Sequence, residues 1–316
     1  MSFGQMLLND IKKELIMCGI VGLFLKEDSL KPELGNMLSQ MLVTMSDRGP
    51  DSAGIAVYND EKTGESKLTI QSIQPEKDFP ELVGYIKSEL NVSVSLKQNH
   101  NHAVLYSCKN QVNNIRELLQ KHKKEIGVVS IGEQIEIYKE VGLPKFVAET
   151  FSLKSMTGSH GIGHTRMATE SAVSTLGAHP FSTGPDQCLV HNGSLSNHSS
   201  LRRKLKREGI YFETENDTEV GAAYLSWCMQ QGFSLKEALQ KGLSDLDGFY
   251  TFVVGTKDGF GVLRDSVACK PAIMAENSKY VAFGSEYRAL AVLPNIDQAE
   301  VWEPEPATVY FWNKKT

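Results

Sequence analysis

Strand-like segments lie near both ends of this 316-residue chain, and helical patterns lie between them. An apolar run punctuated by glycines follows Cys18 and ends at Leu25, which predicts a buried strand. The last third of the chain carries four more such segments, at 250–254, 261–263, 281–283 and 308–312. This order indicates an α+β protein in which two sheets pack face to face beneath helical layers.

Helical spacing of apolar residues recurs between these strands. It predicts helices at 34–45, 197–207, 219–229 and 234–241, with further strands at 53–58 and 188–190. The helix at 197–207 contains the basic run 202–207, which we expect on the solvated face of the helix. A phosphate-binding patch is the less favoured interpretation.

The stretch from about 59 to 156 has mixed patterns. Helices are predicted at 79–90 and 113–124, and strands at 103–108 and 127–138. A segment of this length cannot be one structureless loop in a compact domain, so we interpret it as a folded insertion.

Composition excludes several functional classes. The formal net charge of −5 argues against a nucleic-acid partner, and no apolar stretch reaches the roughly 18 residues that a membrane helix needs. Residues 1–16 lack the pattern of a secretory signal. Five scattered cysteines without a CxxC pair fit a reducing compartment, so we expect a cytoplasmic protein.

Several polar clusters are weak signals when taken singly. The segment 158–163 lacks the Lys-Ser/Thr of a phosphate-binding loop. His100 and His102 could bind a metal, but without acidic neighbours they are more typical of a surface or a strand. The triplet His191-Asn192-Gly193 could be a simple turn.

In combination, six motifs in a fixed order are specific. They are Met17-Cys18-Gly19-Ile20, 47–54, 163–169, Ala178-His179-Pro180, His191-Asn192-Gly193 and Asn216-Asp217-Thr218-Glu219. Together they resemble the class II, N-terminal-nucleophile glutamine amidotransferases, and the match continues to Ser285-Glu286. The finer resemblance is to free-standing amidotransferase subunits of glutamate-synthase-like assemblies, including the N-methylglutamate synthase type. It implies a four-layer αββα sandwich of two antiparallel sheets.

The resemblance implies that Cys18 attacks the side-chain amide of L-glutamine. A glutamyl thioester and ammonia would form, and water would then release glutamate. A cysteine thiol has an ordinary pKa of about 8.5 and a terminal α-amine about 7.7–8.0, so a terminal cysteine carries its own base. Asn192 and Gly193 correspond to the oxyanion hole of the family.

The remaining site residues concern the amino-acid end of the substrate. The resemblance implies that Arg166 grips the α-carboxylate with help from Thr169, and that Asp217 pairs with the α-ammonium. His179 is expected to line the pocket, and Arg48 and Gly49 to pack against the nucleophile. Each residue taken alone could instead be a turn residue or part of a surface ion pair.

Residues 1–17 precede the expected nucleophile. We interpret them as a propeptide or as untranslated leader, with the amidotransferase domain spanning 18–316 and the insertion inside it. An amphipathic helix is the alternative, because Phe3, Leu7, Ile11 and Leu15 recur every four residues.

The leading hypothesis is thus a glutaminase subunit that passes ammonia to a separate synthase subunit. A glutamine-sensing regulatory subunit and another N-terminal-nucleophile amidase or acylase are the alternatives. The sequence offers no motif for a flavin, nucleotide or sugar phosphate, so we predict no cofactor and no metal.

Overall fold

A seven-stranded antiparallel sheet forms the first of two central layers. The computed structural model describes residues 18–60, 62–167 and 173–314. The strand order is β14-β12-β13-β1-β8-β2-β7, so β1 and β8 lie in the middle of the sheet. The strands are β1 (Gly19–Leu25), β2 (Ser52–Tyr58), β7 (Ile135–Val141), β8 (His160–Arg166), β12 (Ile273–Glu276), β13 (Tyr280–Gly284) and β14 (Glu300–Trp302).

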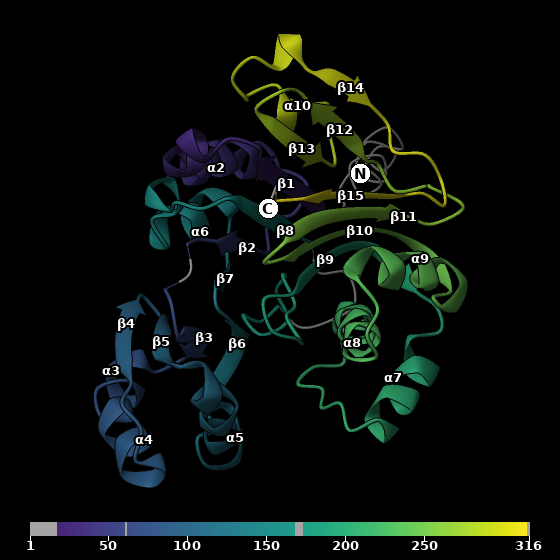
Figure 1. The fold of residues 1–316 in the computed structure, drawn as a ribbon. Helices are drawn as coiled ribbons and strands as arrows, with labels where there is room; N and C mark the ends of the chain where they lie inside the picture. Colours follow the sequence, from purple (N-terminus) through teal and green to yellow (C-terminus); the bar gives the residue numbers. More distant parts are fainter. Residues whose placement is uncertain (1–17, 61, 168–172, 315–316) are drawn as a thin grey trace, which may run out of the picture.

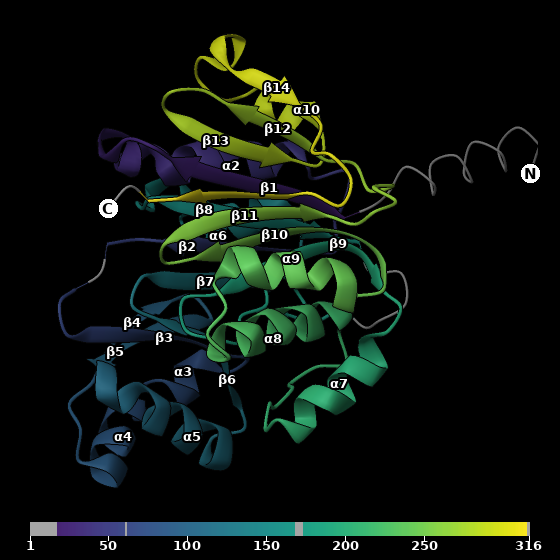
Figure 2. The ribbon, with the colours of Figure 1, turned by 45° about the vertical axis from the view of Figure 1, so that its right-hand side comes forward.

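A four-stranded antiparallel sheet forms the second central layer, in the order β15-β11-β10-β9. An apolar cluster that includes Ile20, Ile162, Val253 and Phe260 holds the two sheets together. Figure 2 shows them stacked. The strands are β9 (Cys188–Leu195), β10 (Gly248–Thr256), β11 (Gly259–Arg264) and β15 (Val309–Asn313).

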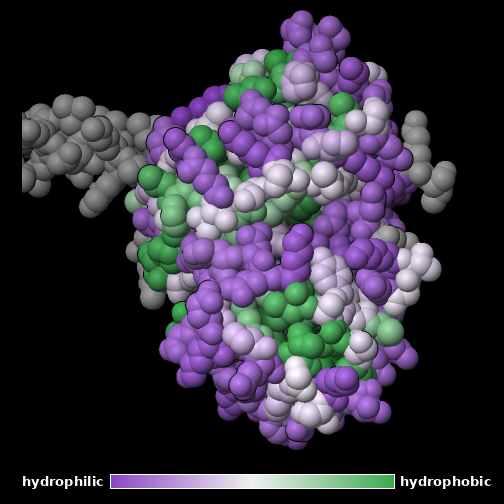
Figure 3. All heavy atoms as spheres, turned by 90° about the vertical axis from the view of Figure 1, so that its left-hand side faces the viewer, coloured by the Kyte–Doolittle hydropathy of each residue, from purple (hydrophilic) through white to green (hydrophobic). Residues whose placement is uncertain are grey.

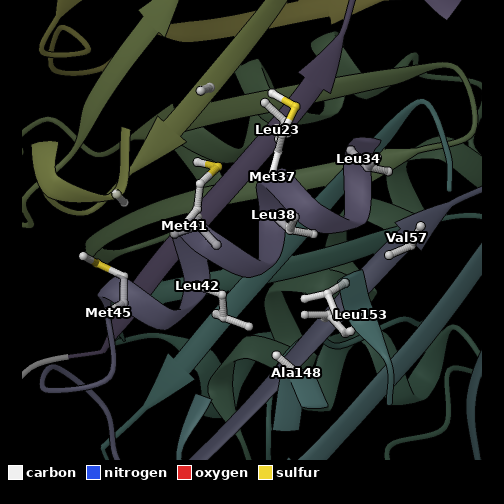
Figure 4. Close-up of a cluster of buried hydrophobic side chains, with 14 of the residues drawn as sticks. Leu23, Leu34, Met37, Leu38, Met41, Leu42, Met45, Val57, Ala148 and Leu153 are labelled. Atoms are coloured by element: carbon white, nitrogen blue, oxygen red, sulfur yellow. The ribbon is translucent and has the colours of Figure 1, made fainter. Parts of the chain in front are cut away.

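Helices cover the outer face of each sheet. Figure 4 shows the side chains of α2 (Leu34–Thr44), among them Leu38 and Met41, packed over β1, where they belong to one buried cluster with Leu23. The other helices on this side are α6 (Pro144–Thr150) and α10 (Tyr287–Leu290). The second sheet is covered by α7 (His198–Arg207), α8 (Asp217–Gln230) and α9 (Leu235–Asp245). The expected four-layer αββα sandwich is confirmed (Figure 1).

A third antiparallel sheet, with the order β4-β5-β3-β6, forms a separate unit. It has its own apolar core, which includes Leu68, Ile86, Ile115 and Leu119. Its strands are β3 (Glu65–Ser72), β4 (Ser95–Asn99), β5 (His102–Cys108) and β6 (Ile126–Gly132), and its helices α3 (Pro75–Asp78), α4 (Leu82–Leu90) and α5 (Val112–His122). Within the range 59–156, β7, α6 and the 3₁₀ helix at Leu153–Ser155 belong to the main sandwich, and the division into domains stays a prediction.

The 3₁₀ helices are short connections. They are η1 (Asp28–Glu33), η2 (Lys109–Gln111), η3 (Leu153–Ser155) and η4 (Ile296–Gln298).

The surface of the inserted unit is mixed in polarity. Figure 3 shows the left-hand face of Figure 1, where a hydrophobic patch interrupts a mostly hydrophilic lower half.

In the described ranges, no helix combines the length and the apolar character that crossing a bilayer would require.

Several predicted elements differ in detail from the structure. The segment 127–138 is not one strand but parts of two, β6 and β7, and the helix predicted at 79–90 is α4, which begins only at Leu82. The basic run is not wholly solvated, because Arg202 is buried and binds the carbonyl oxygens of Thr214 and Asn216. Strands β3, β4, β12 and β14 were not predicted. The amphipathic pattern at 3–15 lies outside the described residues.

Candidate active site

Cys18 directly precedes β1, in the middle of the seven-stranded sheet. Its side chain is half-buried, and its Sγ lies 3.9 Å from the carbonyl oxygen of Met167, the residue directly after β8. Burial raises the pKa of the Cys18 thiol, while the positive charges of Arg166 and Lys270 act against this shift. The thiol is therefore protonated at neutral pH and needs a base before it can act as a nucleophile.

The carbonyl oxygen of Cys18 accepts two hydrogen bonds. Asn192 Nδ2 donates across 3.1 Å and Arg48 Nε across 3.3 Å. Arg48 is itself paired with Glu286, whose second carboxylate oxygen lies 2.6 Å from Arg288 Nε. Arg48, Glu286 and Arg288 thus form a series of alternating charges, and its first member holds the backbone of Cys18, the expected nucleophile.

The backbone after Cys18 is anchored by two hydroxyl groups. Gly19 N donates to Thr165 Oγ1 across 3.2 Å, and Ile20 N donates to Ser285 Oγ across 2.9 Å. Gly49 lies against the same region, since a Cβ at Gly49 would come within 2.7 Å of backbone atoms of Thr165 and Arg166. Only a residue without a side chain allows this close approach.

Asn192 and Gly193 lie inside β9, and the turn interpretation of this triplet is wrong. Asn192 is opposite Thr251 and Gly193 opposite Tyr250 in the pairing with β10. Gly193 has a φ of 141°, and a Cβ there would lie 2.0 Å from the carbonyl oxygen of Phe249. This conformation requires glycine at this position of β9.

Asp217 is the first residue of α8, where the helix dipole favours a carboxylate. Its Oδ2 accepts from Leu195 N across 2.9 Å, and its Oδ1 lies 3.7 Å from His191 Nδ1. The preceding Asn216 caps the helix by accepting from Thr218 N. These contacts hold the carboxylate in place while leaving the side chain 24% exposed.

Three buried histidines connect Asp217 to the end of β8. The rings of His164 and His179 stack at 4.0 Å, and His164 Nε2 donates to the carbonyl oxygen of His191 across 3.3 Å. The hydroxyl of Thr218 joins His179 Nε2 at 2.7 Å and His191 Nδ1 at 3.0 Å. Burial lowers the pKa of all three rings, that of His164 to about 3, so the cluster is neutral.

Arg166 ends β8 and lies beside both groups. Its charge acts on the Cys18 thiol and on the rings of His164 and His179. The fold therefore brings Cys18, Arg48, Gly49, Arg166, His179, Asn192, Gly193 and Asp217 to one end of the two sheets. Thr169 lies outside the described residues.

The described residues contain no group of three or more histidine, cysteine, aspartate or glutamate side chains that could hold a metal ion. His102 is buried in β5, where its ring packs against Tyr138 and Phe151, and burial lowers its pKa to about 3.

Sequence reasoning missed several partners of the site. Glu286 was noted only as the end of the motif series, while Arg288, Thr165 and Thr218 were not singled out for any role. Of these residues, Thr218 could have been singled out by its position, because it directly follows Asp217 in one of the six motifs. The ion pair between Arg48 and Glu286 joins residues far apart in the chain, and no local pattern reports it.

The sequence of this chain is similar to those of proteins named as glutamine amidotransferases or as glutamine amidotransferase-like. A family model described as a glutamine amidotransferase domain matches residues 164–292. The chain is 61% identical to the glutamine amidotransferase-like protein GlxB of Rhizobium meliloti (strain 1021), over 94% of this chain and 98% of that protein. A provisionally named glutamine amidotransferase of Methanothermobacter thermautotrophicus is 33% identical, over 93% of this chain and 99% of its own length.

Among solved structures, the fold is similar to a glutamine phosphoribosylpyrophosphate amidotransferase from B. subtilis, with a TM-score of 0.60 and 21% identity. The match covers 94% of this chain but only 47% of that one. At this identity the similarity concerns the fold alone.

Proposed function

The chain belongs to the class II glutamine amidotransferase family, and on this basis we propose that it is a glutaminase subunit with Cys18 as nucleophile. The reaction would convert L-glutamine and water to L-glutamate and ammonia. The observation that carries the proposal is the environment of Cys18, a thiol beside Arg166 whose own carbonyl oxygen is fixed by Asn192 and Arg48.

The α-amine of Cys18 is the best candidate for the base. In the described part of the chain, no histidine, aspartate or glutamate side chain hydrogen-bonds to Cys18 Sγ, and burial favours the protonated thiol. A free α-amine has a pKa close to neutrality and is attached to the same residue, so it can accept the thiol proton. This requires that the active polypeptide begin at Cys18.

The chemical steps follow from these groups. Cys18 sulfur attacks the side-chain amide carbon of glutamine as its proton moves to the α-amine. The oxyanion that forms would be stabilised by the Asn192 side-chain NH₂ and the Gly193 backbone N–H. The α-ammonium group of Cys18 then returns the proton to the amide nitrogen, the C–N bond breaks to release ammonia, and a thioester remains. Water then cleaves the thioester, releasing glutamate and the free thiol.

Recognition of the amino-acid end would fall to Arg166 and Asp217. A guanidinium matches the two oxygens of the α-carboxylate, and the carboxylate of Asp217 matches the α-ammonium. The neutral rings of His164 and His179 lie between them and add no competing positive charge. Thr169 would assist Arg166, and His179 would line the pocket.

A separate synthase subunit would use the ammonia. The motifs resemble those of free-standing amidotransferase subunits of glutamate-synthase-like assemblies, and the unit built on β3–β6 would be the docking surface for such a partner. We expect the isolated subunit to be a slow glutaminase that its partner accelerates. Glutamate release measured with and without the co-purified partner and its acceptor substrate tests this, and equal rates would favour a stand-alone glutaminase.

The decisive experiment combines intact mass with glutamate release. Active protein should have the mass of a chain that begins at Cys18, and Cys18→Ala should abolish hydrolysis. Cys108→Ala is the matched control, because Cys108 is an exposed cysteine of the inserted sheet. Full activity in a chain that retains Met17 would rule out the α-amine mechanism. Glutamine binding without hydrolysis by the processed protein would favour a glutamine-sensing regulatory subunit.

A further inference from the structure

A cavity of about 490 Å³ lies between the inserted unit and the main sandwich, outside the Cys18 site. Figure 1 shows the elements on its two sides, with α5 and β6 facing α8. Its lining includes Arg116 and Gln120 of α5, Glu213 and Thr214 of the segment before α8, and Lys139 and Phe181.

Arg116 faces this cavity without a protein partner. Its guanidinium makes no hydrogen bond or ion pair with any described residue, and its Nε is buried without a hydrogen-bond partner. A buried guanidinium nitrogen is strongly destabilising unless it is paired. The absence of a partner therefore points to a group from outside the chain, and a carboxylate is the best geometric match.

Glu213 is the acidic group that complements Arg116 in this cavity. Its carboxyl lines the cavity and lies near the Gln120 amide, and no cationic nitrogen of the described residues lies within ion-pair distance. Burial and the neighbouring Glu219 carboxylate raise the pKa of Glu213, with Lys139 and Arg116 acting against this shift at longer range. A nearby ammonium would relieve this unfavourable environment.

Two other charged groups of the cavity, Glu219 and Lys139, are already engaged. Glu219 accepts hydrogen bonds from the backbone N–H groups of Glu213 and Thr214. Lys139 Nζ donates to the carbonyl oxygens of Leu176 and Ala178, each at 3.0 Å. Glu117 and Glu208 also line the cavity, at exposed positions. Arg116 and Glu213 form no ion pair with any described residue, so these two opposite charges remain available to a ligand.

We propose that this cavity binds a small zwitterionic α-amino acid, with its carboxylate on Arg116 and its ammonium toward Glu213. A simple anion would satisfy only Arg116, and a simple amine only Glu213. The ring of Phe181 supplies an apolar surface for a short side chain.

The site is linked to the glutamine pocket through the chain that follows Glu213. Arg202 donates to the carbonyl oxygens of Thr214 and Asn216, and Asn216 caps the helix that begins with Asp217. A ligand on Glu213 therefore contacts the segment that leads directly into Asp217.

The test uses three probes of nearly equal size. L-Alanine carries both charges, propionate only the carboxylate and ethylammonium only the amine. Each is titrated by calorimetry into Asp217→Ala protein, in which the proposed glutamine clamp has lost its carboxylate. L-Alanine should bind at least about 10-fold more tightly than either single-charge probe, because each lacks one charged hydrogen bond.

Variants locate the binding. Arg116→Gln and Glu213→Gln, added singly, should each weaken L-alanine binding about 10-fold or more, while Arg203→Gln on the exposed side of α7 should not. Melting temperatures establish that the variants fold. Equal binding of all three probes, or undiminished binding in Arg116→Gln and Glu213→Gln, would overturn the proposal. The titration needs neither Cys18 chemistry nor glutamine hydrolysis, so its failure is distinct from failure of the proposed function.

Discussion

Asn192 Nδ2 donates to the carbonyl oxygen of Cys18 across 3.1 Å, and this bond joins the two sheets of the sandwich at the candidate site. Asn192 belongs to β9 of the four-stranded sheet, whereas Cys18 leads into β1 of the seven-stranded sheet. The group proposed to stabilise the oxyanion is therefore positioned by direct contact with the residue proposed to create it.

Asn192→Ala should lower kcat for glutamine hydrolysis by about 10²- to 10³-fold, as expected for loss of one oxyanion donor. KM should change much less, because the donor acts mainly on the charge that develops during reaction. Steady-state kinetics of glutamate release measures both. Asn114→Ala, on the exposed face of α5, is the matched control, and a kcat equal to that of the parent would remove Asn192 from the oxyanion hole.

Glu286→Gln should lower kcat by about 10-fold while KM stays near the parent value. Glu286 pairs with Arg48, whose Nε holds the carbonyl oxygen of Cys18. Without the carboxylate, the buried guanidinium loses a charged hydrogen bond worth about 1.5–3 kcal/mol and its fixed position. The same kinetic assay applies, with the exposed Glu300→Gln as control. An unchanged kcat would mean that Arg48 is held well enough by other contacts.

Asp217→Ala should lower kcat/KM for glutamine about 10- to 150-fold, mainly through KM, because the α-ammonium loses a charged partner worth about 1.5–3 kcal/mol. Part of the effect could come from the lost contact with Leu195 N, so melting temperature is measured alongside. Glu215→Ala is the control, since Glu215 precedes the same helix but its side chain is 91% exposed. Glutamine hydrolysis at the parental rate would contradict the assignment of Asp217.

Most of the fold could be predicted from local patterns. The spacing of Leu34, Leu38 and Met41 predicted α2, and continuous apolar runs predicted β1 and β10. The extension of β9 through Asn192 could not be predicted, because its polar residues resemble a turn and only pairing with β10 keeps them in the strand. The short strands β12 and β14 depend in the same way on their neighbours in the sheet.

The residues of the candidate site also fall into two groups, those that local motifs predict and those that only long-range contacts bring together. The ordered motifs identified Cys18, Asn192 and Asp217, because each stands in a short run of residues with a recognisable pattern. The residues that position these three side chains could not be identified from local motifs. Glu286 contacts Arg48, and Thr218 contacts His179, only after the chain has folded. Long-range contacts of single side chains leave no periodic signal in the sequence.

The free energy of unfolding should fall as the pH drops below about 6.5. Burial lowers the pKa of His102, His160 and His164 to about 3, so these rings stay neutral in the folded protein and take up protons on unfolding. Between pH 6.5 and 3 the unfolded chain thus binds more protons, and stability rises with pH there, by up to about 1.4 kcal/mol per pH unit for each ring. Above pH 6.5 this contribution is constant.

Urea unfolding at a series of pH values, with His160→Gln as the variant, measures one of these contributions. The His160 ring stacks on Tyr58 at 4.0 Å, and its Nε2 donates to the carbonyl oxygen of Thr256. Removing the ring should destabilise the protein at pH 7.5. It also removes one titrating group, so the slope of the free energy of unfolding against pH between 6 and 5 should become shallower by about 1 kcal/mol per pH unit. His122→Gln, at an exposed position of α5, should leave the slope unchanged. A His160→Gln slope as steep as that of the parent would mean that the buried ring is protonated in the folded state as readily as in the unfolded chain.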